Sequence, residues 1–296
     1  MGGTVTGGTV TGDTVTGDTV TGDTVTGDTA ADPLAARVVV LGASNVQLGL
    51  AAIVQACGEA VAGPVDLMAA LGHGRSFGRP SSIPCRTLPA IIDCPLWEDL
   101  AARPAAPTCS LITDIGNDLL YGRTPHRTAA WVATCVRRLS EQGPVTLTSL
   151  PLRNLDSLTN RRYLTFRTLF FPKFRLSLGE LGRRAHELND RLVELTVSHG
   201  CRTIELPVAW YGFDPIHYRL RARRAVWRAL MHQAIGRDEP NSAVVDTKQD
   251  KKTVLRFTER PKIWSAAPAK RVLCGVSRCC RQPCVRLSEG TRVSLY

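Results

Sequence analysis

The strongest constraint on this chain is a regular alternation of short apolar runs with longer amphipathic stretches between residues 37 and 235. Short β-branched runs predict buried strands, and apolar residues at three- and four-residue spacing predict helices that bury one face. The predicted strands are 37–42, 65–71, 108–115, 145–150 and 201–206. The predicted helices are 45–60, 131–139, 176–198 and 219–235. This alternation predicts an α/β fold with a parallel sheet covered on both faces.

The two ends of the chain differ from this region in composition. Residues 1–36 are dominated by repeats of Thr-Val-Thr-Gly-Asp, which offer too little apolar surface to offset the entropy of ordering. Residues 237–296 are basic, contain four cysteines and show no clear period. We therefore expect one domain over 37–236, flanked by a low-complexity tail and by a mostly disordered basic tail.

The overall composition excludes some classes of protein. No apolar run is long enough to cross a membrane, and no cationic segment followed by an apolar stretch begins the chain, which predicts a cytoplasmic location. The cysteines of the middle region are scattered, which is typical of free thiols in a reducing compartment. The net charge of +11 favours anionic partners, although it is also typical of a solvated basic surface.

In a parallel sheet with helices on both faces, binding and catalytic residues lie beyond the carboxyl ends of the strands. Ser44 meets this condition, because Gly42-Ala43-Ser44-Asn45 joins the first predicted strand to the first predicted helix. The free N–H groups and the dipole of a helix N-terminus stabilise an oxyanion. Serine at this position is more often simply a helix N-cap, so the motif alone favours a cap over a nucleophile.

Asp214 and His217 follow the last predicted strand. An aspartate three residues before a histidine can orient the imidazole while the imidazole serves as a base toward a nucleophile. The alternative is that Asp214-Pro215 starts a helix and that His217 lies in its first turn.

Two further motifs follow the second and third predicted strands. The Gly74 N–H and the Asn117 side-chain amide can donate hydrogen bonds to an oxyanion, since glycine lets a substrate approach the backbone closely. A plain glycine-rich loop at Gly74 and a turn or helix cap at Asn117 are the alternatives.

In this order the four motifs resemble the blocks of the SGNH (GDSL-like) hydrolases. The blocks correspond to residues 42–45, 72–76, 116–118 and 214–217, and the resemblance spans about residues 37–236. The stretches LGASN, ALGHGRSFG, ITDIGNDLLYG and WYGFDPIH are also similar to a bacterial SGNH group of unknown substrate.

The resemblance implies a flavodoxin-like three-layer α/β/α sandwich with Ser44 as nucleophile, His217 as base and Asp214 orienting His217. It implies an oxyanion hole made by the Ser44 N–H, the Gly74 N–H and the Asn117 side chain. The chain departs from the family pattern before the nucleophile, where Ala43 stands in place of aspartate. It departs again in the third block, where Ile115 stands in place of glycine.

The remaining motifs are weaker indications of function. Ser76, in Gly74-Arg75-Ser76-Phe77-Gly78, matches the Gly-x-Ser-x-Gly nucleophile elbow, but the proline-containing sequence after it cannot open the helix that this elbow requires. The same loop lacks the helix of a dinucleotide site, and no phosphate-binding loop is present. The cysteines of 237–296 form no paired Cys-x-x-Cys units. We expect neither a metal nor a cofactor.

Residues 161–175 interleave arginine and lysine with tyrosine and phenylalanine. Such a segment can bind nucleic acid or an anionic membrane surface, but an insertion that packs its aromatic side chains inward is the commoner case. The sequence as a whole predicts a serine esterase or acyl-hydrolase acting on a small-molecule or carbohydrate ester. Acyl transfer at the same site, or non-catalytic binding of nucleic acid or anionic surfaces, are the alternatives.

Overall fold

A computed structural model describes residues 1–3, 34–171, 175–236 and 257–296. Most of the predicted repeat tail, residues 4–33, lies outside the described residues. The helices and strands all belong to one compact unit, Asp32–Tyr296.

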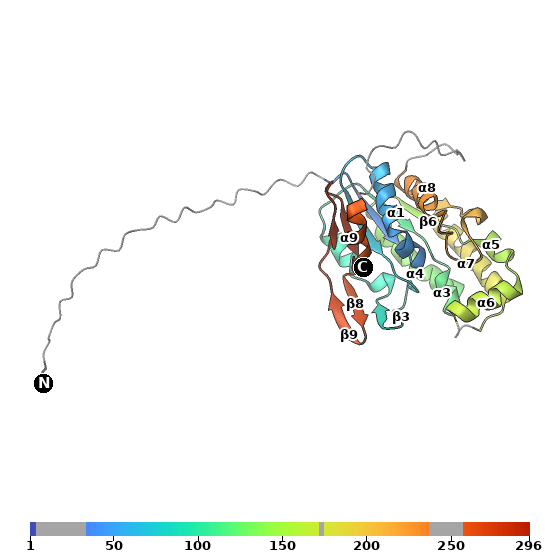
Figure 1. Ribbon diagram of the computed structural model, residues 1–296, viewed down its shortest axis with the longest axis horizontal. Helices are drawn as coiled ribbons and strands as arrows, with labels where there is room; N and C mark the ends of the chain where they lie inside the picture. Colours follow the sequence, from blue (N-terminus) through green and yellow to red (C-terminus); the bar gives the residue numbers. More distant parts are fainter. Residues whose placement is uncertain (4–33, 172–174, 237–256) are drawn as a thin grey trace. The chain divides into compact units, whose positions relative to one another are not determined.

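The centre of this unit is a mostly parallel sheet (Figure 1). Five of its strands correspond to the five predicted from the sequence: β1 (Ala36–Leu41), β2 (Val65–Ala70), β5 (Thr108–Ile112), β6 (Val145–Thr148) and β7 (Arg202–Ile204). These five are all parallel and lie in the order β2-β1-β5-β6-β7. This is the flavodoxin-like order, so the predicted fold class is confirmed.

Helices cover both faces of the sheet. The helices are α1 (Ser44–Ala60), α2 (Leu96–Ala102), α3 (Asn117–Leu120), α4 (Pro125–Ser140), α5 (Leu152–Asp156), α6 (Asn160–Phe170), α7 (Leu178–His199), α8 (Arg223–Ile235) and α9 (Arg260–Trp264). Short 3-10 turns lie at Ile91–Asp93, Val208–Trp210 and Phe257–Glu259. One layer contains α1 packed on α8, and the other contains α4 packed on α7.

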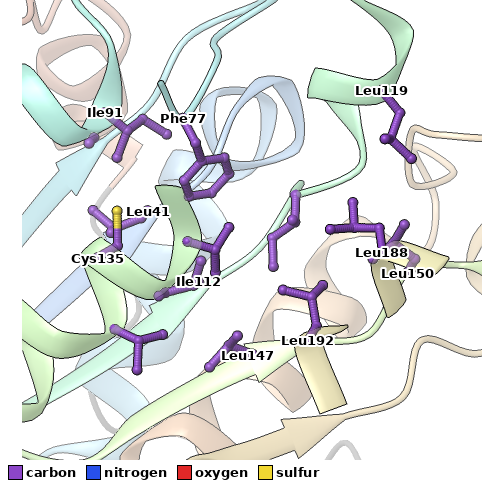
Figure 2. Close-up of a cluster of buried hydrophobic side chains, with 14 of the residues drawn as sticks. Leu41, Phe77, Ile91, Ile112, Leu119, Cys135, Leu147, Leu150, Leu188 and Leu192 are labelled. Atoms are coloured by element: carbon purple, nitrogen blue, oxygen red, sulfur yellow. The ribbon is translucent and has the colours of Figure 1, made fainter. Parts of the chain in front are cut away.

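Successive side chains of each strand point to opposite faces of the sheet, so the hydrophobic core has two halves, one on each face. In β1, Val38 and Val40 face the layer of α1 and α8, whereas Val39 and Leu41 face the layer of α4 and α7. Figure 2 shows the second half, where Leu41 and strand residues from β5 and β6 meet side chains of α4 and α7. Both faces of the central strands are thus buried, which explains their near-continuous apolar sequences.

The four predicted helices are present, and capping residues mark the ends of α4 and α7. Thr124 caps α4 by accepting a hydrogen bond from the Arg127 N–H, and Ser177 caps α7 by accepting one from the Glu180 N–H. Gly200 ends α7 in the left-handed conformation with φ of 63°. The shorter helices α2, α3, α5, α6 and α9 were not predicted.

The expectation of a disordered tail after residue 236 is wrong for residues 257–296, while residues 237–256 lie outside the described residues. The added strands are β8 (Lys270–Leu273), β9 (Val276–Cys279), β10 (Val285–Arg286) and β11 (Arg292–Leu295). Strand β11 pairs in parallel with β2, and Val293 and Leu295 are buried. The exposed edge of β2 offers backbone hydrogen-bond partners that order this C-terminal segment. The domain therefore extends beyond the boundary predicted at residue 236.

The C-terminal residues also support the glycine-rich loop after β2. A small antiparallel sheet joins β3 (Ser81–Ile83) and β4 (Arg86–Leu88) of that loop to β8 and β9. The buried guanidinium of Arg75 donates hydrogen bonds to the backbone oxygens of Leu71 and Tyr296. The loop that carries Gly74 is therefore held from two sides.

Within the described residues, no helix combines the length and the apolar character needed to cross a membrane. All ten cysteines are free thiols. Cys57, Cys94 and Cys135 are buried as expected, but Cys85 is exposed at the turn between β3 and β4.

Candidate active site

Ser44 is the first residue of α1, directly after the turn that leaves β1. The turn is tight, because a Cβ added at Gly42 would lie 2.4 Å from a methyl carbon of Val46. The residue in the N-cap position is Ala43, which has no side-chain hydrogen bond to the helix. The alternative role of Ser44 as an N-cap is therefore excluded, and its hydroxyl is available for other contacts.

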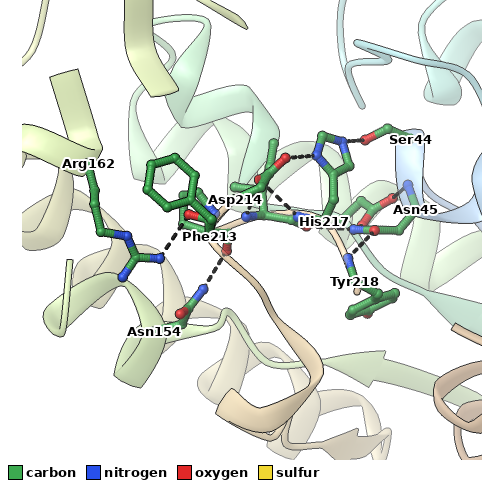
Figure 3. A network of polar contacts seen from close by, with 11 residues as sticks. Ser44, Asn45, Asn154, Arg162, Phe213, Asp214, His217 and Tyr218 are labelled. Atoms are coloured by element: carbon green, nitrogen blue, oxygen red, sulfur yellow. Dashed lines mark hydrogen bonds and ion pairs between the residues drawn. The ribbon is translucent and has the colours of Figure 1, made fainter. Parts of the chain in front are cut away.

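The Ser44 hydroxyl faces the imidazole of His217 (Figure 3), with 2.9 Å between Ser44 Oγ and His217 Nε2. The other ring nitrogen, His217 Nδ1, lies 2.5 Å from Asp214 Oδ2. A hydroxyl, an imidazole and a carboxylate in this order match a nucleophile, its base and the group that orients the base. Residues 173 positions apart in sequence are thus brought into hydrogen-bond contact.

The loop of Asp214 and His217 is not helical, so the alternative reading of Asp214-Pro215 as a helix start is wrong. Asp214 Oδ1 accepts hydrogen bonds from the N–H groups of Ile216 and His217 at 2.9 and 3.2 Å. Burial favours the neutral acid, but the hydrogen bonds and the charge of His217 outweigh it and lower the pKa of Asp214 below its ordinary value. The orienting group is therefore a carboxylate across the neutral pH range.

Asn45 links the nucleophile turn to the histidine loop. Its side-chain amide donates to the Ile216 carbonyl at 2.8 Å, and its side-chain oxygen accepts from the Tyr218 N–H at 3.0 Å. The same amide donates to Asp114 Oδ1 at 2.8 Å. Because Asn45 is adjacent to Ser44, these contacts fix the position of His217 relative to Ser44 (Figure 3).

Asp114 completes this network from the loop after β5. Its Oδ2 accepts the backbone N–H groups of Ala43 and Asn45 at 2.9 and 3.1 Å. The residue has a left-handed φ of 58°, uncommon outside glycine, and burial raises its pKa. Neither Asn45 nor Asp114 was assigned a role from the sequence. Asn45 adjoins Ser44, and Asp114 lies three residues before Asn117, but the contact between Asn45 and Asp114 leaves no signal in the sequence.

The candidate oxyanion donors all follow strands of the sheet at the same edge. The Ser44 N–H lies in the first turn of α1, where backbone N–H groups have no acceptor within the helix. Gly74 follows β2 and has a left-handed φ of 66°. Asn117 opens α3 after β5 and is 8 % exposed.

The loop of Gly74 is tied to the helix that begins at Ser44. The His73 N–H donates to Gln47 Oε1 on α1 at 2.9 Å. Burial, followed by the positive charge of Arg86, lowers the pKa of His73.

Ser76, the competing nucleophile, has different partners. Its hydroxyl donates to Asp118 Oδ1 and accepts from the N–H groups of Gly78 and Arg79. Asp118 also accepts the Phe77 N–H at 2.9 Å. The serine is buried and bound to a carboxylate rather than to an imidazole, so it stabilises the loop and has no base.

Residues 161–170 of the segment predicted as an insertion belong to α6, which braces the histidine loop. Arg162 donates to the carbonyls of Gly212 and Phe213 at 3.1 and 2.8 Å, and Asn154 on α5 donates to the Pro215 carbonyl at 2.7 Å (Figure 3). Tyr163 and Phe166 are buried in the core, so these two rings cannot stack on bases. No sequence motif singled out Asn154 or Arg162 as part of the site.

Two hollows adjoin these residues. A small cavity of about 90 Å³ is lined by Asn117 and mostly by apolar residues, some of them from α5, α6 and α7. A larger hollow of about 980 Å³ is lined by Gly74 and by residues of the loops after β2 and α3. Leu120 lines both, so this side chain lies between the two hollows, with Asn117 lining one and Gly74 lining the other.

No model of a known protein family matches the chain, and no curated protein matches it. Several solved structures do. A carbohydrate acetylesterase family member from Sinorhizobium meliloti is 14% identical, with 68% of this chain and 99% of that chain covered and a TM-score of 0.48. The aryl esterase of M. smegmatis is 13% identical, with 67% and 97% covered and a TM-score of 0.46. A G-D-S-L lipolytic protein from Veillonella parvula is 15% identical, with 67% and 97% covered and a TM-score of 0.44.

The strand order and the contacts between the serine, histidine and aspartate agree with the arrangement that the sequence motifs imply. The chain therefore has a flavodoxin-like α/β/α fold.

Proposed function

We propose that this chain is a serine hydrolase that cleaves an ester through an acyl-enzyme on Ser44. The observation that carries this proposal is the continuous contact from Ser44 Oγ through His217 to Asp214. A serine hydroxyl is a weak nucleophile by itself, and an adjacent base whose second nitrogen is held by a carboxylate activates it.

In the first half of the reaction, Ser44 Oγ attacks the ester carbonyl carbon while its proton passes to His217 Nε2. The developing oxyanion accepts hydrogen bonds from the Ser44 N–H, the Gly74 N–H and the Asn117 side chain. The intermediate then expels the alcohol, which takes the proton from His217. In the second half, water attacks the acyl-enzyme, its proton passes to His217, and the carboxylic acid leaves as Ser44 regains its hydrogen.

The apolar cavity beside Asn117 is suited to the acyl group. It is smaller than the apolar cavity of about 150 Å³ that holds benzene in an engineered protein, so it fits a short acyl chain. An alcohol or sugar hydroxyl that replaced water in the second half would make the same residues an acyltransferase.

The test combines hydrolysis of short p-nitrophenyl esters with labelling by a fluorophosphonate, which reacts with activated serines. We expect the wild type to hydrolyse the esters and the label to map to Ser44. Ser44→Ala should abolish both, and His217→Ala should lower the rate by roughly three to six orders of magnitude.

Ser76→Ala is the matched control, because Ser76 is also buried but contacts a carboxylate. Labelling that persists in Ser44→Ala and disappears in Ser76→Ala would reverse the assignment. Product analysis with an added alcohol distinguishes transfer from hydrolysis.

A further inference from the structure

The larger hollow beside Gly74 is strongly basic. Among the residues that the structure describes, its lining contains four arginines and neither aspartate nor glutamate. The arginines come from three separate segments of the chain: Arg79, Arg123, Arg175 and Arg184. Because like charges repel, such a cluster costs stability unless an anion offsets it.

Neighbouring carboxylates compensate little of this charge. Arg184 forms an ion pair with Glu180, with 2.7 Å between Nε and Oε1, but Glu180 also pairs with Arg183. Arg123 interacts electrostatically with Asp118, which is buried and already bound to Ser76. Within the described part of the chain, Arg79 and Arg175 have no ion-pair partner.

The hollow is positioned for one side of the ester. Gly74, a candidate oxyanion donor, lines it, and Leu120 separates it from the apolar cavity next to Asn117. An ester whose carbonyl lies at the oxyanion donors would therefore have the apolar cavity on its Asn117 side and the basic hollow on its Gly74 side. A short acyl chain fits the apolar cavity, so the basic hollow is left for the alcohol part of the ester.

We propose that the alcohol part of the substrate carries an anionic group, with phosphate as the best match, bound by Arg79, Arg123 and Arg175. This deepens the proposed function and rests on it. Guanidinium groups from several directions suit the oxygens of a phosphate, because each can donate two parallel hydrogen bonds. The volume of about 980 Å³ also admits a group much larger than a simple alcohol.

The experiment compares three acetate esters with closely similar phenol leaving groups. They are 4-(hydroxymethyl)phenyl acetate, its phosphate monoester and 4-acetoxyphenylacetate, which are neutral, phosphate-bearing and carboxylate-bearing. We expect the phosphate ester to have a kcat/KM at least about tenfold above that of the neutral ester, mainly through a lower KM. The carboxylate ester should lie between them, and the preference should weaken as salt is added.

The double variant Arg79→Gln/Arg175→Gln tests the arginines. Both side chains are exposed and lack ion-pair partners among the described residues, so the substitutions should not disturb folding. We expect the ratio of kcat/KM between the phosphate and neutral esters to fall to within about threefold of one. The matched control Arg137→Gln/Arg161→Gln removes the same charge from exposed positions outside the hollow and should keep the ratio.

Equal kcat/KM for all three esters, or an equal loss of preference in both double variants, would overturn the anionic subsite while leaving ester hydrolysis intact. Calorimetric titration with phenyl phosphate separates the two proposals. Binding to the wild type but not to Arg79→Gln/Arg175→Gln supports the subsite even if Ser44 proves inactive. Absence of binding to the wild type at low salt counts against the subsite.

Discussion

Among single residues, Asn45 shows how one side chain can align Ser44 with His217. It contacts the backbone on both sides of His217 and the carboxylate of Asp114, while its own backbone adjoins Ser44. A displacement of about 1 Å between reacting groups can cost roughly a hundredfold in rate. Asn45 is therefore a positioning residue, since its contacts are with the groups that hold Ser44 and His217.

We expect Asn45→Ala to lower kcat by about 10- to 100-fold with little change in KM, because the histidine loop loses two hydrogen bonds. Steady-state kinetics on a p-nitrophenyl ester measures this, and the rate of fluorophosphonate labelling should fall in proportion. Gln55→Ala, on the same helix and away from the histidine loop, is the control and should match the wild type. A rise in KM alone would contradict the role.

Asp214 gives a prediction about pH. Its pKa in the folded protein lies below the ordinary value of 3.8, so its ionised form stabilises the fold above that pH, and this contribution is lost as the pH falls through the folded pKa. We expect the free energy of unfolding of the wild type to exceed that of Asp214→Asn at neutral pH. Urea unfolding at a series of pH values down to the acid range should show the difference shrinking; a constant difference would contradict it.

At the scale of elements, the contact between α1 and α8 holds the nucleophile helix on the sheet. The indole of Trp227 on α8 lies directly against Gly49 on α1, so that a Cβ at Gly49 would be 1.8 Å from Trp227 Nε1. The glycine is required for this close approach of the two helices. Because α1 carries Ser44 at its first position, a shift of the helix also moves Ser44.

We expect Gly49→Ala to destabilise the protein by about 1–3 kcal/mol through overpacking, and to reduce activity. Gly182→Ala on α7 is an opposite-sign control, because a Cβ there has open space around it. It should stabilise the protein by about 0.5–1 kcal/mol, since alanine favours helix more than glycine does. Thermal and urea unfolding measure both, and destabilisation by both substitutions would contradict the packing argument.

The helices and strands whose apolar residues recur at a regular spacing are the ones that the sequence predicts. The five parallel strands and four long helices have clear apolar periods, and Ser44, Gly74, Asn117 and His217 follow the strands as expected. Helix α6 was not predicted, since its basic and aromatic residues alternate without a clear apolar face. Its role in bracing the histidine loop depends on Arg162 reaching backbone some fifty residues away.

At the scale of the whole molecule, the fold depends on its C-terminal residues. Strand β11 covers the edge of β2, and the Val65 N–H donates to the Thr291 hydroxyl across 226 positions of sequence. The buried Arg75 links the same C-terminal strand to the loop of Gly74. Residues 257–296 therefore belong to the structure that positions the site.

We expect deletion of 257–296 to abolish cooperative unfolding, because it exposes the edge of β2 and the apolar side chains that β11 covers. The milder Val293→Ala, at a fully buried position, should cost about 2 kcal/mol in urea unfolding. Deletion of residues 1–31, outside the compact unit, should leave the melting temperature unchanged. If the two deletions lowered the melting temperature equally, residues 257–296 would not be more important for stability than residues 1–31, contrary to this prediction.

The α/β class, the order of the strands along the chain and the sheet edge at which Ser44, Asp214 and His217 lie could all be predicted from the residues. They follow from local periodicity and from the rule that parallel strands end at one edge. The Asn45–Asp114 network, the arginine-lined hollow and the pairing of β11 with β2 could be seen only in the folded chain. Each is a contact between groups far apart in sequence, and its energy depends on spatial proximity, which leaves no periodic trace in either segment.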